Sequence, residues 1–307
     1  MDFQFSDSSG RCVSVSATVS DPFRRLALLC ACALGATLLS SSSVLASSER
    51  PALRSIQPPY FSADVAVTMD STSRARVRII VSLPYPELNW ERTGEGYSAG
   101  AAYVVELKPE RGPKRLYGDS WEKRLLIIDY RSTVSQRNQL VETREFDVPP
   151  GRYEVRVTVR DVRALEPSDV RDRLEVRDLS RVPVNFADLE LGLVDSSGRF
   201  IPFPGRQFGF NSSGVAMRSV MLDRRPGVWP RPYQYHWRLL DDAGATVAQG
   251  DTNVSVERPA MPVVMRPAHG ELFIGGYSLE LELQEGKTSW RTARTFEVEE
   301  SGPPRGR

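Results

Sequence analysis

The sequence predicts an all-β protein made of two tandem immunoglobulin-like antiparallel β-sandwich domains after an N-terminal hydrophobic segment. Short runs in which apolar and polar residues alternate with a period of two recur along most of the chain, and no helical period is sustained. Glycine and proline, 22 of each in 307 residues, are spread between these runs as turn residues. The strand pattern of the first half also recurs in the second half, which indicates two domains of one kind.

The N-terminal segment is typical of an export signal. Arg24 and Arg25 precede an apolar run from Leu26 to Leu39, which is followed by four serines and then by Val44-Leu45-Ala46. The run is shorter than the roughly 20 apolar residues that a membrane-spanning helix needs. We therefore expect residues 1–46 to be a signal that is removed after Ala46. Two alternatives stay open: an uncleaved inner-membrane anchor over residues 26–46, and a lipoprotein signal around Leu29-Cys30-Ala31-Cys32.

Composition narrows the possible chemistry. All three cysteines, Cys12, Cys30 and Cys32, lie before Ala46, so the exported chain would have no disulfide, thiolate nucleophile or cysteine-bound zinc. The chain has 40 Lys and Arg against 39 Asp and Glu, with both signs interspersed, so it lacks the excess of basic residues that is typical of nucleic-acid-binding proteins. Two histidines cannot complete a zinc site. We expect no cofactor, no metal and no nucleic-acid partner.

Residues 47–58 are predicted to be a polar linker, and residues 59–180 the first β-sandwich. Its clearest strand has Tyr153, Val155, Val157 and Val159 on one face and charged or polar residues on the other. This alternation is typical of an antiparallel strand that is buried on one side. The expected strands of this domain cover residues 77–83, 97–107, 125–130, 140–148, 152–160 and 171–177.

Residues 181–299 are predicted to be the second β-sandwich, and residues 300–307, rich in Pro, Gly and Arg, a disordered tail. Asp241-Asp242-Ala243-Gly244 predicts a hairpin turn. Gly275-Gly276-Tyr277 repeats the pattern of Gly151-Arg152-Tyr153 at the start of a penultimate strand. The expected strands cover residues 186–194, 215–222, 233–239, 245–248, 254–256, 277–283 and 290–298.

Part of the chain resembles the N-terminal region of bacterial GWxTD-domain proteins. The residues that carry the resemblance are Phe61, Asp64, Val77 to Leu83, Pro84-Tyr85-Pro86-Glu87-Leu88-Asn89-Trp90, Tyr97-Ser98-Ala99 and Pro149-Pro150-Gly151-Arg152-Tyr153. The resemblance extends over residues 60–298 and implies an exported protein with β-sandwich domains, but little about activity. The Gly-Trp-x-Thr-Asp segment that defines the family should follow the second sandwich and does not occur in this sequence.

The densest aromatic stretch runs from Trp229 to Trp237. Tyr233, Tyr235 and Trp237 share one face of a strand, and we expect that face to be core. Trp229, between valine and proline before the strand, is the expected exposed member and a candidate to stack on a sugar. Arg231 and His236 complete this candidate binding surface.

Tyr85 and Trp90 are the other candidate binding residues. Their segment is either an exposed recognition loop or a rigid crossover in which Leu88 and Trp90 plug the sandwich, and we favour the crossover. No nucleophile elbow, P-loop or dinucleotide-binding motif occurs. We therefore expect a non-enzymatic, exported envelope protein, periplasmic or at the cell surface, that binds a protein partner. A carbohydrate-binding module that uses Trp229 is the alternative, and a hydrolase with carboxylates in a cleft between the domains is a remote one.

Overall fold

The computed structural model describes residues 50–70, 72, 74–112, 115–178, 183–210, 214–267, 269–285 and 288–300, and the backbone of three short strands near the N-terminus. These strands are β1 (Gln4–Ser6), β2 (Cys12–Ser14) and β3 (Val44–Leu45). Residues 1–42 and 43–307 form separate units. Most of the predicted signal, the domain boundary predicted at residues 180 and 181, and residues 301–307 of the predicted tail lie outside the described residues.

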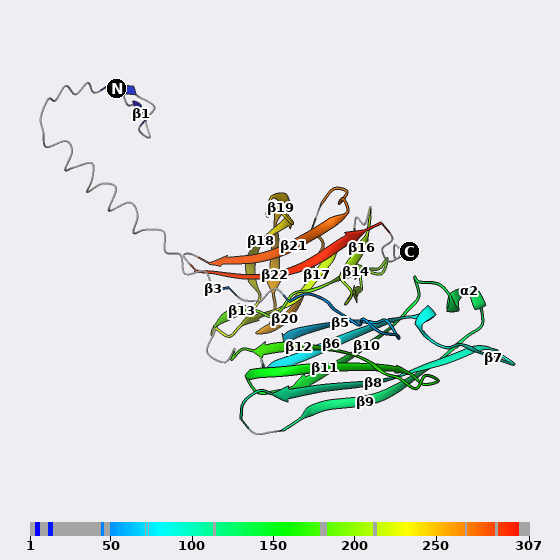
Figure 1. The fold of residues 1–307 in the computed structure, drawn as a ribbon. Coiled ribbons are helices and arrows are strands. Elements are labelled where there is room, and N and C mark those ends of the chain that lie inside the picture. Colours follow the sequence, from blue (N-terminus) through cyan, green and yellow to red (C-terminus); the bar gives the residue numbers. More distant parts are fainter. Residues whose placement is uncertain are drawn as a thin grey trace, which may run out of the picture. The chain divides into compact units, whose positions relative to one another are not determined.

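The first half forms two facing sheets (Figure 1). The strands of one sheet, in spatial order, are β10 (Gln139–Asp147), β6 (Ala75–Pro84), β5 (Ser62–Met69) and β4 (Leu53–Arg54). The other sheet contains β12 (Ser168–Val176), β11 (Gly151–Asp161) and β8 (Gly96–Pro109), and β8 also pairs with β7 (Glu91–Thr93) and β9 (Tyr117–Ile127). The short helices η1 (Tyr85–Glu87) and α2 (Tyr130–Thr133) lie in loops at one end.

The second half repeats this plan. One sheet contains β13 (Val184–Phe186), β17 (Ala216–Asp223), β14 (Glu190–Val194), β15 (Phe200–Pro202) and β20 (Ala260–Met265). The other contains, in order, β16 (Gln207–Gly209), β22 (Thr288–Glu299), β21 (Gly275–Glu285), β18 (Arg231–Asp241) and β19 (Thr246–Val256). β3 also pairs with β22, and its pairing and that of β16 are parallel, whereas the other strand pairs of the described residues are antiparallel.

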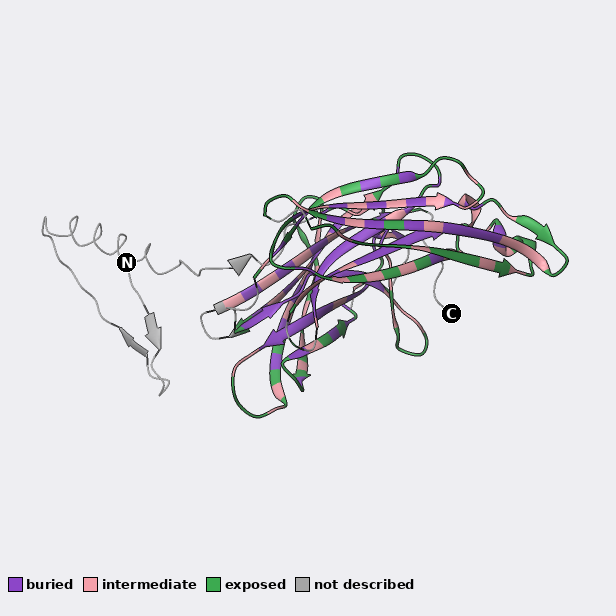
Figure 2. Cartoon of the chain, turned by 90° about the horizontal axis from the view of Figure 1, so that it is seen from below, coloured by how far each residue is buried: buried purple, intermediate pink, exposed green. Residues whose placement is uncertain are grey.

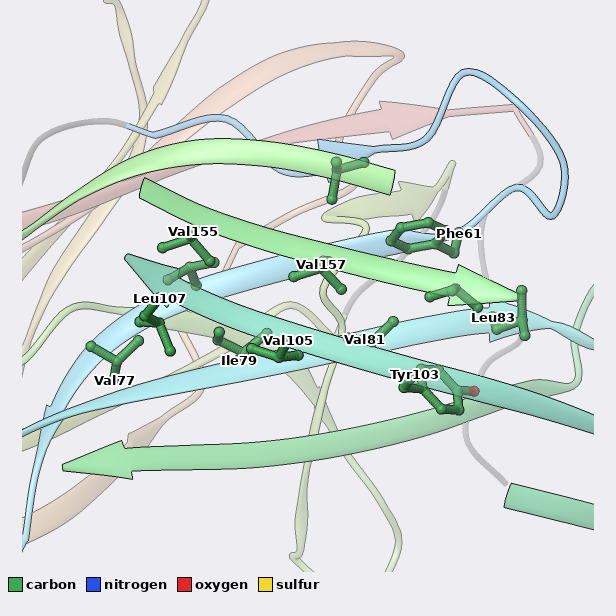
Figure 3. Packing of buried hydrophobic residues seen from close by; sticks show 14 of the residues in the cluster. Phe61, Val77, Ile79, Val81, Leu83, Tyr103, Val105, Leu107, Val155 and Val157 are labelled. Carbon is green, nitrogen blue, oxygen red and sulfur yellow. The ribbon is translucent and has the colours of Figure 1, made fainter. Parts of the chain in front are cut away.

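The predicted all-β sandwich fold is confirmed. In the first half, the predicted inner row of β6 is fully buried and faces the inner rows of β8 and β11 (Figure 3). The buried core residues of β6 are Val77, Ile79, Val81 and Leu83. A second cluster of the same kind, which includes Phe186, Tyr235 and Leu281, fills the second half. Figure 2 shows this burial within the strands, with exposed residues at the hairpins and outer strands.

The repeated glycine-tyrosine pattern forms the same local structure twice. The hydroxyl of Tyr153, at the start of β11, donates to the Pro149 carbonyl at 2.7 Å, and that of Tyr277, at the start of β21, donates to the Phe273 carbonyl at 2.9 Å. Each bond returns to the residue four positions upstream. This is the arrangement of the tyrosine corner of immunoglobulin-like sandwiches.

The two sandwiches contact each other through the faces of two sheets. β5 and β17 lie at this contact, so each is buried on both of its faces. Met69 of β5 clusters with Val220 and Leu222 of β17. The backbone N–H of Asp188 donates to the Val67 carbonyl at 2.9 Å, and its carboxylate accepts the Val67 N–H at the same distance. Ile80, on the face of β6 opposite to Ile79 and Val81, is buried as well.

Some predicted strand limits are wrong. The strand predicted at residues 125–130 is β9, which begins at Tyr117 and ends at Ile127. The strand predicted at residues 186–194 is split into β13 and β14 by the residues that bond to β5. The pieces predicted at residues 245–248 and 254–256 belong to one long strand, β19. The strands β4, β5, β7, β15, β16 and β20 were not predicted.

Candidate functional site

Trp229 and Arg231 lie in a cluster built around a buried carboxylate. Trp229 is half-buried against the core of the second sandwich, and the Arg231 guanidinium lies 4.5 Å from its ring centre. Arg231 donates to Asp223 at 2.7 Å, and Arg225 and the Tyr233 hydroxyl also bond to that carboxylate. Burial alone would raise the pKa of Asp223, but these hydrogen bonds outweigh it and hold the pKa well below its ordinary value. Arg231 therefore holds the loop before β18 in place.

The rest of the aromatic stretch is core, as predicted. Tyr233, Tyr235 and Trp237 are buried on the inner face of β18. Burial, and next the hydrogen bond to Asp223, raise the pKa of Tyr233 to about 12. His236 lies on the outer face of β18, where its Nδ1 is 2.5 Å from Oδ1 of Asp251 on β19. His236 therefore lies on the opposite side of the sheet from Trp229 and Arg231.

Tyr85 and Trp90 lie in the first sandwich and belong to a different surface. The predicted crossover is present: Leu88 is buried in the core, and Tyr85 and Trp90 pack against that core with their ring centres 5.5 Å apart. The Trp90 indole N–H donates to the Tyr85 carbonyl at 2.8 Å. The Asn89 N–H donates to the buried Asp161 carboxylate at 2.5 Å, which fixes the crossover to the end of β11.

Around this crossover, four loops meet at one end of the first sandwich. Residues 55–61, 84–90, 128–138 and 161–168 all lie where strands enter or leave the same end of the two sheets. Hydrogen bonds connect them: Ser168 to the Gln57 carbonyl at 2.8 Å, Tyr60 N–H to Glu87 at 2.9 Å, and Tyr85 N–H to the Asn138 carbonyl at 2.9 Å. The loops thus form one connected surface.

These loops expose several large apolar side chains, alongside exposed charged residues such as Arg131 and Glu166. We call the apolar surface the apolar loop end, and it consists of the exposed side chains of Ile56, Tyr60, Ile128, Tyr130, Val134 and Leu165. Ile56 is 88% exposed, Ile128 83% and Leu165 93%, values that are unusual for such large side chains. Apolar groups gathered in this way mark interaction sites on soluble proteins. The sequence pattern did not predict this surface, apart from its neighbours Tyr85 and Trp90.

Carboxylates do lie between the sandwiches, but arginines surround them. Asp64 of β5 bonds to Arg206 and Arg294 of the second sandwich, and Asp188 bonds to Arg50 at 2.6 Å. Burial by itself would raise the pKa of Asp64, but Arg294 and then Arg206 outweigh it and lower the pKa. A general acid needs a raised pKa, so this carboxylate is not set up for that role.

A nearby cavity of about 500 Å³ is also lined by carboxylates. They are held by other groups: Asp241 by the N–H groups of its own turn, Glu280 by Arg238, and Glu297 by Arg54. Within the described ranges, no group of three or more His, Cys, Asp or Glu residues is arranged to hold a metal ion. No helix of the described part of the chain is long and apolar enough to cross a membrane.

Comparisons with known proteins add a likeness of fold only. No family model and no curated protein matches the chain, so the resemblance to GWxTD-domain proteins stays a prediction. Similar solved structures include red sea bream transglutaminase (8% identity, 78% of this chain and 31% of that chain, TM-score 0.22). A glycosyl hydrolase family 2 member from Bacteroides cellulosilyticus DSM 14838 has 10% identity over 72% of this chain and 28% of that chain, with a TM-score of 0.29. This chain therefore spans about a third of those proteins or less, and likenesses this weak carry no argument about function.

Proposed function

We propose that this chain is an exported envelope protein that binds a protein partner, without catalysis, through the apolar loop end of the first sandwich. The observation that supports this proposal is the exposure of six large apolar side chains on three of the four connected loops. Tyrosines near the centre of an interface supply much of its binding energy, and the buried centre is more apolar than the rest of the protein surface. Loops fixed by a rigid β-sandwich are a common place for such recognition.

Site-specific photo-crosslinking tests this proposal. A photoreactive residue at Leu165 should capture a defined protein from the native envelope fraction, and unlabelled wild-type chain should compete for it. A photoreactive residue at Val228 is the matched control, because Val228 is 87% exposed but lies in the second sandwich. Unlabelled Leu165→Glu should compete at least tenfold less well, since it places a charge in the apolar contact. Equal capture from both positions, or equal competition by the variant, would contradict the proposal.

The glycan-binding alternative has weaker support. It needs an open aromatic face, whereas Trp229 is half-buried and the Arg231 guanidinium lies over its ring. A polysaccharide-binding assay in which Trp229→Ala abolishes retention would revive it.

The proposal that the protein is exported rests on the residue pattern before Ser47. Because the apolar run is short and small residues follow it, we propose removal after Ala46. N-terminal sequencing of the chain from its native envelope should then begin at Ser47. A chain that begins before Leu26 would favour the uncleaved anchor over residues 26–46, and lipid attached to Cys30 or Cys32 would favour the lipoprotein.

A further inference from the structure

The outer strands of the sandwiches differ in how they are protected from pairing with other chains. β9, β10 and β12 each carry four or more charged residues, and β15 and β20 each contain a proline. Charges and proline on an outer strand are the usual means of preventing unwanted strand addition. β19 has eleven residues, no proline, and Asp251 as its one charged side chain. It is the least protected long outer strand of the described residues.

No strand of the described residues covers the outer side of β19. Among the described strands, only β18 pairs with it. A bulge interrupts this pairing near the hairpin, between Leu239 and Leu240, and from Ala248 to Val256 the register is continuous. Over these residues the even-numbered side chains turn inward and the odd-numbered ones are exposed. The exposed row consists of Gln249, Asp251, Asn253 and Ser255.

We propose that β19 pairs with β19 of a second copy of this chain, antiparallel, about a two-fold axis at Thr252. In this register Asp251 lies opposite Asn253 of the partner subunit, and Gln249 lies opposite Ser255 of the partner subunit. Each polar pair occurs twice by symmetry, as an isologous interface requires. Thr252 then faces its own symmetry mate, and threonine pairs across strands are favourable.

The exposed row favours this register over those with the axis at Asp251 or at Gly250. Strand faces are preserved only if odd-numbered residues pair with odd-numbered ones, so the register can change only in steps that keep this parity. An axis at Asp251 would place two carboxylates opposite each other, which is destabilising. An axis at Gly250 would place Asn253 opposite Val247 of the partner subunit and lose a polar pair. An axis at Thr252 lets each Asn253 amide donate to a carboxylate.

The existing contacts of Asp251 are compatible with this pairing. Its Oδ1 contacts His236 on the β18 side, and Oδ2 has no hydrogen-bond partner among the described residues. Asn253 is exposed, so it can be changed without removing core packing. The paired strands would join the sheet that contains β18 and β19 in each copy into one continuous sheet across the dimer. This inference does not depend on the apolar loop end, which lies in the other sandwich.

Sedimentation equilibrium of the full chain tests the proposal. Wild type should dimerise. Asn253→Asp places carboxylates opposite each other at two symmetric positions and should raise the dimer Kd about tenfold. Asn253→Lys places an amine opposite each Asp251 and should lower the Kd. Gln249→Asp is the matched control: it adds the same charge but faces Ser255 of the partner subunit, so its Kd should stay within about twofold of wild type.

Circular dichroism should show that all four proteins fold alike. A wild-type chain that is monomeric at its highest soluble concentration would overturn the proposal. So would a dimer that Asn253→Asp does not weaken, or one that Gln249→Asp weakens more than Asn253→Asp does.

Discussion

At the scale of single residues, the two corner tyrosines show how one hydroxyl fixes a chain reversal. The rings of Tyr153 and Tyr277 are buried, and each hydroxyl satisfies a carbonyl of the turn that precedes its strand. Burial, and then Tyr117, raise the pKa of Tyr153, so the neutral donor form is favoured. The hydroxyls therefore contribute to stability through the hydrogen bond, while the rings contribute through packing.

We predict that Tyr153→Phe and Tyr277→Phe each lower the free energy of unfolding by about 1 kcal/mol, because each leaves a carbonyl without its partner while keeping the ring. The double variant should lose about the sum, since the two corners lie in different sandwiches. Urea denaturation measures both losses. Tyr130→Phe, at an exposed ring, is the control and should change stability by less than about 0.5 kcal/mol. A corner variant as stable as this control would show that the hydrogen bond contributes nothing.

At the scale of elements, strands with one face on a core were the predictable ones. The alternation in β6, β8, β11, β18 and β21 follows burial, so the sequence pattern identified them. β9 was predicted too short because it is an outer strand, and Asp119, Glu122 and Lys123 interrupt its apolar pattern. β19 was predicted as two pieces because no apolar side chain lies from Gln249 to Asn253, where the chain in fact continues as a strand.

Candidate binding residues, like strands, could be predicted only where neighbouring residues in the sequence reveal them. Tyr85 and Trp90 were found because they are close in sequence, in a segment with two prolines and two aromatic residues that stands out from the strands around it. Ile56 and Leu165 could not be found, because they are far apart in the sequence and only the fold brings their loops together. Arg231 was identified without Asp223, since nothing in the sequence shows that this carboxylate is buried beneath it.

At the scale of the whole molecule, buried charge joins the two sandwiches. Asp64 receives hydrogen bonds from Arg206 at 3.2 Å and from Arg294 at 2.7 Å, and Arg294 also donates to the Val65 carbonyl at 2.8 Å. Asp64, Arg206 and Arg294 are each at most 4% exposed. Nε and Nη1 of Arg294 are buried without partners, so the cluster is not an optimal source of stability. Its geometry is instead specific: it is satisfied only when the sandwiches meet in one orientation.

We therefore predict that Asp64→Asn lowers the free energy of unfolding by about 3–5 kcal/mol, because two guanidinium groups stay buried without a counter-charge. The loss should fall on the contact between the sandwiches. Wild type should unfold in one calorimetric transition at neutral pH, and Asp64→Asn in two. Glu175→Gln, which removes an exposed ion pair with Arg152 at 3.8 Å, is the control and should cost less than about 1 kcal/mol.

Acid should reproduce the effect of the substitution. The pKa of Asp64 is held below its ordinary value, so its ionised form stabilises the folded state. This contribution is fully present above about pH 4 and is lost as the pH falls through the lower pKa of the folded state. The stability difference between wild type and Asp64→Asn should therefore shrink on acidification below about pH 4. A difference that is constant with pH, or two transitions in neutral wild type, would show that Asp64 does not couple the sandwiches.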